Sequence, residues 1–221
     1  MKRKDKTAII LGATGLTGGL LLERLLHDER YEKIKLFSRS SVAIKNPKIE
    51  EHLVDLLALE EHTANFTADE VFCCIGTTKK KTPDNETYRK IDYGIPVAAA
   101  KAAKNNGINT FIVISALGAS AKSNVFYNKV KGEMEEAVLE QEMTRTFILQ
   151  PSLIGGDRTE KRTGEWLFKQ VMKVVDILLV GSLKKYRTIA PDTLAAAMIW
   201  LANNEYIEAR IASDKIKTLV Q

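Results

Sequence analysis

The sequence predicts an α/β protein of one domain, built on a doubly wound parallel sheet. Six short apolar runs rich in Ile, Val and Phe alternate with amphipathic helical patterns. Continuous apolar character is typical of strands buried on both faces, and strand–helix alternation is typical of a parallel sheet with helices on both sides. The length of 221 residues favours a single domain, in which residues from about 150 to 221 complete a substrate cleft.

The expected elements follow one another without an obvious linker. Strands are expected at 8–11, 34–37, 52–54, 71–75, 111–114 and 146–149, and helices at 16–28, 56–65, 85–106, 123–142 and 192–203. Pro96 lies inside the helix expected at 85–106, where it should kink the helix or mark its true start. Asn106-Gly107 supplies a helix stop before the fifth strand.

Composition and charge narrow the class of protein. Hydrophobic residues make up 45% and charged residues 28%, which is ordinary for a globular protein with a full core. The net charge of +5 suits a phosphate-bearing ligand. Basic residues are interleaved with acidic ones except at Lys2-Arg3-Lys4 and Lys79-Lys80-Lys81, so we expect no nucleic-acid partner.

Several other features are expected to be absent. No stretch approaches the length of a membrane span, and the apolar run after the basic start is too short for an export signal. The three histidines lack neighbours at metal-ligand spacing, so no metal site is expected. Cys73 and Cys74 are adjacent on a strand and point to opposite faces, so they offer no disulfide framework. A reduced, cytoplasmic location is therefore predicted.

A glycine-rich turn separates the first expected strand from the first expected helix. Its glycines are spaced as G-x-x-G-x-x-G. Glycines are needed where the backbone must approach a pyrophosphate, and the N-terminus of the following helix attracts negative charge. A plain strand-to-helix turn is the alternative, but this position favours the dinucleotide-binding turn of a Rossmann fold. The candidate cofactor-binding residues are Gly12, Thr14, Gly15, Leu16, Thr17 and Gly18.

The end of the second expected strand indicates which dinucleotide binds. An Asp or Glu about 20 residues beyond the glycine turn would select the ribose hydroxyls of NAD. Here the strand ends in Ser38-Arg39-Ser40-Ser41, which supplies a guanidinium and hydroxyls but no carboxylate. A guanidinium can make a two-pronged contact with the 2′-phosphate of NADP. We therefore expect NADP(H), held by Arg39 and Ser40, the alternative being that Arg39 is only a solvated loop residue.

Three further residues are candidates for contacts along the cofactor. Asp55 follows the third expected strand and could accept from the adenine amino group, cap the next helix, or do both. Gly76, after the fourth strand, would let the backbone pass near the middle of the cofactor. Ile75 would pack against it.

A serine and a Tyr-x-x-x-Lys sequence supply the chemistry. Ser115 directly follows the fifth expected strand, so it lies at the sheet edge where ligands bind in such folds. Tyr127 and Lys131 lie one turn apart on the next expected helix, on one face. The Lys131 ammonium should lower the pKa of the Tyr127 phenol from about 10 towards neutrality. Tyr127 would donate a proton to a carbonyl oxygen held by Ser115, while Lys131 also binds the nicotinamide ribose.

Together these motifs resemble those of the atypical short-chain dehydrogenase/reductases, and most of all the Tat-interactive protein-like subfamily. The resemblance covers nearly the whole chain and is carried by Phe72-Cys73-Cys74-Ile75-Gly76-Thr77-Thr78, Val130-Lys131-Gly132-Glu133, Asp157-Arg158 and Gly164-Glu165-Trp166-Leu167. It implies an NADPH site formed by Thr14, Gly15, Leu16, Thr17, Arg39, Ser40, Ile75, Tyr127, Lys131, Ile154 and Arg162.

Two positions depart from the family pattern. Ala116 stands where a second serine often follows the first, and Arg39 is a single arginine where many relatives have two. The first departure leaves the expected mechanism intact. The second weakens the preference for NADP without reversing it.

Two classes of function remain open. The joint presence of Ser115, Tyr127 and Lys131 favours an NADPH-dependent reductase of a small carbonyl compound. A sensor that binds NADPH and acts through protein partners would need only the glycine turn and Arg39. Epimerase or dehydratase chemistry on a nucleotide sugar fits the glycine spacing, but the chain is short for it. The apolar segment 164–183 should wall the nicotinamide end, which favours lipophilic substrates. A homodimer is left open.

Overall fold

The computed structural model describes residues 5–155, 179 and 181–221, and within them the chain forms a seven-stranded sheet in the order β3-β2-β1-β4-β5-β6-β7. Every neighbouring pair of strands is parallel, which confirms the predicted fold class. The strands are β1 (Lys6–Leu11), β2 (Tyr31–Ser38), β3 (Ile49–Leu53), β4 (Glu70–Cys73), β5 (Thr110–Ile114), β6 (Arg145–Gln150) and β7 (Arg210–Ala212).

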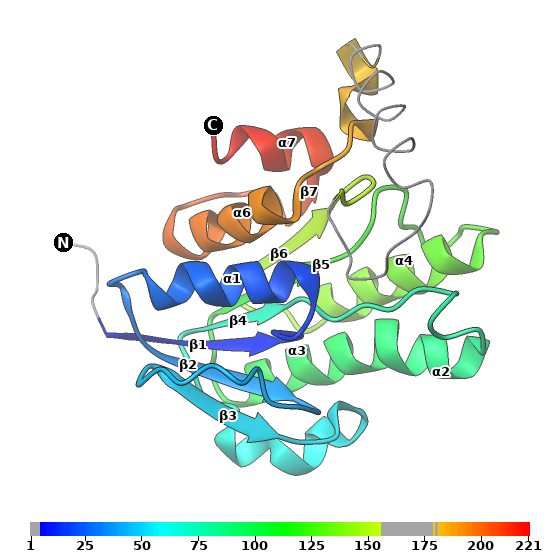
Figure 1. The fold of residues 1–221 in the computed structure, drawn as a ribbon. Coiled ribbons are helices and arrows are strands. Elements are labelled where there is room, and N and C mark those ends of the chain that lie inside the picture. Colours follow the sequence, from blue (N-terminus) through cyan, green and yellow to red (C-terminus); the bar gives the residue numbers. More distant parts are fainter. Residues whose placement is uncertain (1–4, 156–178, 180) are drawn as a thin grey trace, which may run out of the picture.

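Helices cover both faces of this sheet (Figure 1). One face carries α1, α6 and α7, and the other carries η1, α3 and α4. The helices are α1 (Leu16–Leu26), the 3-10 helix η1 (Leu56–Asn65), α2 (Asn85–Arg89), the π-helical turn η2 (Lys90–Gly94), α3 (Ile95–Asn105), α4 (Phe126–Leu139), the 3-10 helix η3 (Gly181–Tyr186), α6 (Pro191–Asn203) and α7 (Ser213–Thr218).

The continuous apolar runs of the strands divide between two cores because successive side chains of a strand point to opposite faces. In β1, for example, Ile10 packs in the core under α1 and α6, while Ile9 packs in the core under α3 and α4. Both are fully buried. Burial on both sides is the physical reason for the unbroken apolar character of the sequence runs.

The structure differs from the expected elements at several places. The helix expected at 85–106 continues through α2, the π-helical turn η2 and α3, and Pro96 lies in the first turn of α3, directly after η2. The segment 56–65 is a kinked 3-10 helix rather than an α-helix. The short strand β7 was not expected, and it pairs with β6 through Ile148 and Arg210.

The strand order reverses at β1, which lies between β2 and β4. Ligands of doubly wound sheets bind beyond the carboxyl ends of the strands at such a switch point. Leu11 and Cys73, the last residues of β1 and β4, lie in register with Val113, the last residue but one of β5. The loops that follow these strands therefore meet at one edge, on the right in Figure 1.

Candidate functional site

The glycine turn after β1 is packed too closely for side chains. Gly12 has a positive φ of 87°, and a Cβ atom there would lie 2.9 Å from the Cys74 carbonyl oxygen. A Cβ atom on Gly18 would lie 2.1 Å from the Gly12 carbonyl oxygen. The N-cap of α1 is Gly15, and no side chain caps the helix N–H groups. This turn fits the pyrophosphate of a dinucleotide because it brings bare backbone and the positive end of a helix to one place.

The loop after β2 carries the residues expected at the adenosine end. Arg39 and Ser40 are both exposed there. The Ser38 hydroxyl donates to the Ser40 carbonyl oxygen at 2.8 Å, which shapes the turn. Asp55 accepts a hydrogen bond from the Leu57 N–H at 2.9 Å, so its helix-capping role is present in the structure.

The loop after β4 lies next to the glycine turn. The Ile75 side chain is half-buried, and its Cδ1 would lie 3.3 Å from a Cβ atom on Gly12. Gly76 is exposed, and a Cβ atom on it would lie 3.6 Å from Asp92 Oδ1 and 3.8 Å from Lys131 Nζ. A side chain at position 76 would therefore lie close to both charges of a buried ion pair.

That ion pair joins Lys131 on α4 to Asp92 in the π-helical turn η2. Lys131 Nζ lies 2.8 Å from Asp92 Oδ1, and Asp92 Oδ2 accepts from the Thr77 N–H at 2.7 Å. The side chains of Lys131 and Asp92 are 4% and 1% exposed. Sequence reasoning missed Asp92, because its inward position depends on the extra residue of a π-helical turn, which no periodicity signals.

Tyr127 lies one turn before Lys131 on α4, as the spacing predicted, and is 38% exposed. Burial raises the pKa of its phenol, Lys131 lowers it and Asp92 raises it, and the net result is a pKa above the usual value. Lys131 thus acts on the phenol in the expected direction, but burial and Asp92 outweigh it, so the pKa is not brought towards neutrality in this arrangement. The unforeseen Asp92 carboxylate offsets part of the Lys131 charge, and burial disfavours the phenolate.

Ser115 is tied to a second buried carboxylate. Its hydroxyl donates to Glu135 Oε1 at 2.5 Å, and Ser115 is 4% exposed. Glu135 also accepts from Gln150 Nε2, at 2.9 and 3.0 Å, and from Arg210 Nε at 2.7 Å. Because an ionised carboxylate only accepts, the Ser115 hydrogen is committed to Glu135, and only its lone pairs are left for a ligand. A role for Ser115 as a donor to substrate would require this bond to change.

The structure thus brings together part of the predicted centre. Tyr127, Lys131 and Glu135 follow one another at four-residue spacing along α4, and therefore share one face of that helix. Lys131 is bonded to Asp92 and Ser115 to Glu135. Sequence reasoning also missed Glu135, whose partner Arg210 comes from the unexpected strand β7.

The residues expected at the nicotinamide end are only partly described. Ile154 is half-buried and bridges to Ile189 next to α6. Arg162 lies outside the described residues. So do Asp157-Arg158, which contribute to the family resemblance, and most of the segment 164–183 expected to form an apolar wall.

Gly132 allows the loop after β5 to lie directly on α4. A Cβ atom there would lie 2.1 Å from the Ser120 carbonyl carbon and 2.2 Å from the Ala121 nitrogen. We expect Gly132→Ala to lower the free energy of unfolding by about 1–3 kcal/mol, because backbone atoms cannot move aside freely. Urea unfolding would measure it.

Gly19→Ala in α1 is the matched control for this prediction. A Cβ atom on Gly19 would meet only the Ala13 carbonyl oxygen, at 3.4 Å, which is an ordinary contact. Alanine favours helices over glycine, so this variant should be as stable as the wild type or more stable. Equal stability of Gly132→Ala and wild type would contradict the predicted overpacking.

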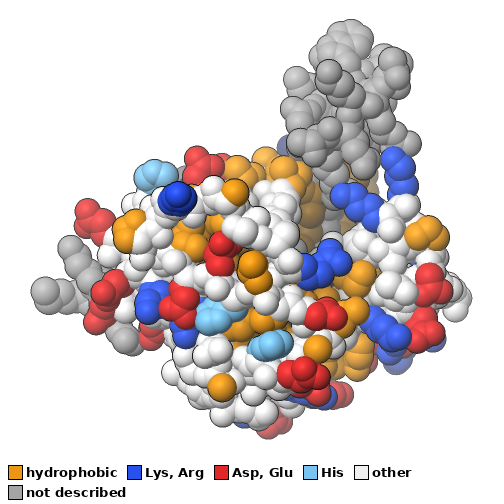
Figure 2. All heavy atoms as spheres, turned by 60° about the horizontal axis from the view of Figure 1, so that its bottom comes forward, with side chains coloured by type: hydrophobic (Ala, Val, Ile, Leu, Met, Phe, Trp, Pro, Cys, Tyr) orange, Lys and Arg blue, Asp and Glu red, His pale blue; other side chains and the backbone are white. Residues whose placement is uncertain are grey.

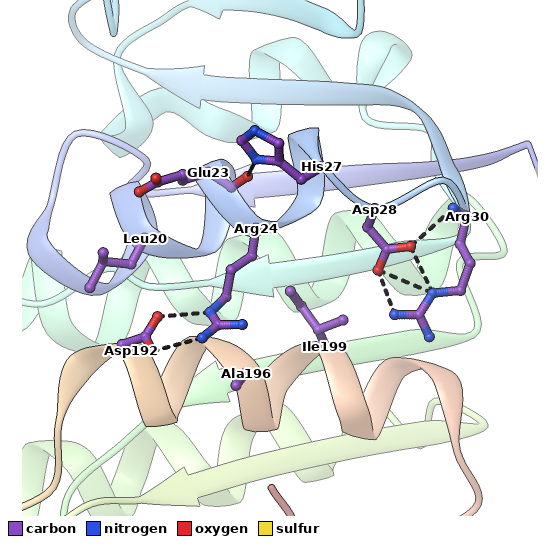
Figure 3. Close-up of a pocket in the computed structure, with 9 residues that line it drawn as sticks. All are labelled: Leu20, Glu23, Arg24, His27, Asp28, Arg30, Asp192, Ala196 and Ile199. Carbon is purple, nitrogen blue, oxygen red and sulfur yellow. Dashed lines mark hydrogen bonds and ion pairs between the residues drawn. The ribbon is translucent and has the colours of Figure 1, made fainter.

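A groove of about 450 Å³ lies elsewhere, between α1 and α6 (Figure 3). Arg24 of α1 and Asp192 of α6 form a two-pronged ion pair across it, with both distances at 2.7 Å. We do not place the site there, because the groove lies outside the glycine turn and the Tyr127–Lys131 face and carries charges of both signs. Its lining residues are Leu20, Glu23, Arg24, His27, Asp28, Arg30, Asp192, Ala196 and Ile199.

Figure 2 shows basic side chains interspersed with acidic ones on the face in view, rather than gathered in one patch. Among the residues that the structure describes, no three His, Cys, Asp or Glu side chains are placed to hold a metal ion. Within the same residues, no helix combines the length and apolar character needed to cross a bilayer.

Comparison with known proteins decides the family. A family model described as NAD(P)H-binding matches residues 12–171, which include the glycine turn, Tyr127 and Lys131. The chain belongs to the NAD(P)H-binding family. It is 32% identical over 173 residues to Protein HTATIP2 of Rattus norvegicus, covering 76% of this chain and 71% of that protein. The resemblance to atypical short-chain dehydrogenase/reductases is thereby confirmed.

Fungal proteins are about as similar to this member of the family as the rat protein is. The chain is 34% identical to Protein FMP52-1, mitochondrial, of Scheffersomyces stipitis over 157 residues, and this alignment covers 69% of each of the two chains. It is 32% identical over 164 residues to Protein FMP52, mitochondrial, of Candida albicans, covering 70% and 69%. These names contradict the predicted cytoplasmic location, which is therefore wrong. The prediction rested on two cysteines that form no disulfide framework, and this observation is compatible with more than one compartment.

Solved structures share the fold of this NAD(P)H-binding protein. Pen from Bacillus thuringiensis superimposes with a TM-score of 0.71 at 16% identity, covering all of this chain and 77% of the other. The UDP-Glc/GlcNAc 4-epimerase from Campylobacter jejuni gives a TM-score of 0.67 at 15% identity, covering 96% and 82%. At such low identity the likeness establishes the fold alone.

Proposed function

We propose that this protein is an NADPH-dependent oxidoreductase that reduces a small carbonyl compound, with Tyr127 as the proton donor. The observation that carries the proposal is the placement of Tyr127. It is partly exposed, its raised pKa keeps the phenol protonated at neutral pH, and it lies one helical turn from Lys131. A protonated phenol at this edge of the sheet is suited to general acid catalysis.

When bound, NADPH supplies the hydride that adds to the carbonyl carbon. The Tyr127 hydroxyl gives its proton to the carbonyl oxygen, so the carbonyl compound and NADPH become an alcohol and NADP⁺. The tyrosinate left behind takes a proton from solvent. Lys131 would bind the nicotinamide ribose beside Tyr127, and Ser115 would contact the reacting oxygen through its lone pairs once that oxygen carries hydrogen.

The other residues of the site would hold the cofactor. The turn formed by Gly12, Thr14, Gly15, Leu16, Thr17 and Gly18 would bind the pyrophosphate. Ile75 and Gly76 would line the middle of the cofactor, and Asp55 would reach its adenine. Ile154 and Arg162 would flank the nicotinamide end. A lipophilic substrate remains our proposal from the apolar composition of 164–183.

The preference for NADP(H) is proposed from the exposed Arg39 and the absence of a carboxylate at the end of β2. We expect NADPH to bind more tightly than NADH, and Arg39→Ala to narrow the difference, since a charge-assisted contact to phosphate contributes about 1.5–3 kcal/mol. Fluorescence titrations with both cofactors would measure it. Arg30→Ala is the control, because Arg30 lies just before the start of β2, at the opposite end of the strand from Arg39. Equal affinities of the wild type for NADPH and NADH would overturn the assignment.

A second function, an NADPH-binding sensor without turnover, is favoured by one observation. Ser115 is nearly buried and gives its hydrogen to Glu135, so it is not set to donate to a carbonyl oxygen. A panel of aldehydes and ketones tested beside an NADPH titration separates the two functions. Tight NADPH binding with no reduction of any compound would favour the sensor.

A further inference from the structure

Glu135 is a buried charge that the proposed reaction does not by itself require. It is 1% exposed and lies on α4, one turn beyond Lys131. Ser115 donates to its Oε1 at 2.5 Å, Gln150 Nε2 lies 2.9 and 3.0 Å from its two oxygens, and Arg210 Nε lies 2.7 Å from Oε2. Burying a carboxylate is costly unless it is paired and hydrogen-bonded. Here the partners come from the ends of β5 and β6 and from β7.

Arg210 reaches Glu135 from the edge of the sheet. In the β6–β7 register it lies opposite Ile148, which packs in the core under α3 and α4, while Ile211 packs in the core under α1 and α6. Because successive side chains of a strand alternate between the two faces, Arg210 points to the α4 side. In the sheet that the structure describes, β7 is the last strand, and the Arg210 side chain is 44% exposed. This one residue therefore links the solvent to the buried anion.

The charge of Glu135 decides which way the Ser115 hydrogen points. An ionised carboxylate only accepts hydrogen bonds, so the Ser115 hydroxyl gives its hydrogen to Glu135 and keeps only lone pairs for another partner. A protonated Glu135 would carry a hydrogen of its own, which it would donate to Ser115 Oγ. The Ser115 hydrogen would then be released for another acceptor.

We propose that Arg210 is a positioning residue, which keeps Glu135 ionised and thereby makes Ser115 a hydrogen-bond acceptor towards the ligand. A ligand group that faces Ser115 must then carry a hydrogen, as the alcohol product does and the carbonyl substrate does not. This inference deepens the proposed function and rests on it for the identity of that ligand. The charge of Glu135 does not depend on the reaction and can be measured without substrate or cofactor.

No neighbouring cation replaces the Arg210 guanidinium within the part of the chain that the structure describes. The Lys131 ammonium is paired with Asp92 at 2.8 Å. Arg145, at the start of β6, directs its guanidinium to backbone carbonyl oxygens at the end of α6. Without Arg210, Glu135 would keep only neutral donors, and a buried carboxylate without an opposite charge favours the protonated form.

The experiment is infrared difference spectroscopy at neutral pH, which detects the C=O stretching band of a protonated carboxyl group. Relative to the wild type, Arg210→Met and Arg210→Gln should each gain one such band, and combination with Glu135→Gln should remove it. Arg210→Lys, which restores the charge, should lack the band. Arg24→Met is the matched control, because its partner Asp192 is 53% exposed and stays hydrated, so no band should appear.

Binding measurements test the consequence for the ligand. Ser115→Ala should weaken binding of the alcohol product by about 3–10-fold, the size of one neutral hydrogen bond. The same variant should leave the KM of the carbonyl substrate nearly unchanged, because a carbonyl oxygen has no hydrogen to give to Ser115. Product-inhibition and steady-state kinetics would measure the two effects.

Three results would overturn the proposal. One is a protonated carboxyl band in the wild type that Glu135→Gln removes. The second is the absence of a new band in Arg210→Gln, which keeps a hydrogen-bond donor at this half-exposed position and tests the charge even if Arg210→Met does not fold. The third is a larger effect of Ser115→Ala on the carbonyl than on the alcohol. The expected bands in a protein that reduces no carbonyl compound would leave the role of Arg210 standing and count against the oxidoreductase alone.

Discussion

Tyr127→Phe is expected to reduce turnover by about 10²–10⁴-fold, the range that general acid catalysis contributes. The change removes one hydroxyl from a side chain that is 38% exposed, so packing should be little altered. NADPH binding should stay close to the wild type, because in the proposed arrangement the phosphates of the cofactor are held by the glycine turn and Arg39 and not by the Tyr127 hydroxyl. Steady-state kinetics with a carbonyl substrate and an NADPH fluorescence titration would measure the two effects.

Tyr186→Phe provides the control, because Tyr186 is an exposed tyrosine of η3 outside the Tyr127–Lys131 face. It should keep the wild-type rate. Wild-type turnover by Tyr127→Phe would show that another group supplies the proton. A loss of rate caused only by weaker NADPH binding would assign Tyr127 to cofactor binding instead of catalysis.

Lys131→Met is expected to destabilise the protein by about 3–5 kcal/mol, the usual effect of removing one partner of a buried ion pair. Asp92 is completely buried, and without the ammonium its carboxylate would keep the hydrogen bond from the Thr77 N–H but lose its ion pair. Methionine keeps much of the volume of lysine, so the loss should come from the unpaired charge. Urea unfolding would measure it.

A double variant distinguishes charge from packing in this prediction. Asp92→Asn combined with Lys131→Met removes both charges and should recover much of the lost stability. Lys129→Met, on the exposed side of the same helix, should change little. If Lys131→Met were no less stable than Lys129→Met, the pair would contribute nothing to the fold.

Much of the fold was predictable because its strands are buried on both faces. The runs around Ile9, Val71 and Phe111 are unbroken by polar residues, and each of these three side chains is fully buried. Strand β7 lacked such a signal. It has three residues, of which only Ile211 is buried, so its pairing with β6 is set by the surrounding tertiary structure rather than by its own sequence.

The candidate site was predictable where function depends on local spacing. The glycine turn and the Tyr127–Lys131 pair are set by contiguous residues, and the structure places each at the expected element. Asp92 and Glu135 were missed because each is surrounded by residues distant in sequence. Glu135 falls in a helix with many charged neighbours, where a carboxylate normally faces solvent, and Arg210 comes 75 residues later.

The Glu135 network has a consequence for how the molecule opens. One buried carboxylate receives hydrogen bonds from Ser115 after β5, Gln150 at the end of β6 and Arg210 of β7. Freeing β7 from the sheet edge would leave this anion without its guanidinium, next to the strand end that carries Ser115. We therefore expect the backbone amides of β7 and of the loop after β5 to exchange as one cooperative unit, although about 95 residues of sequence separate them.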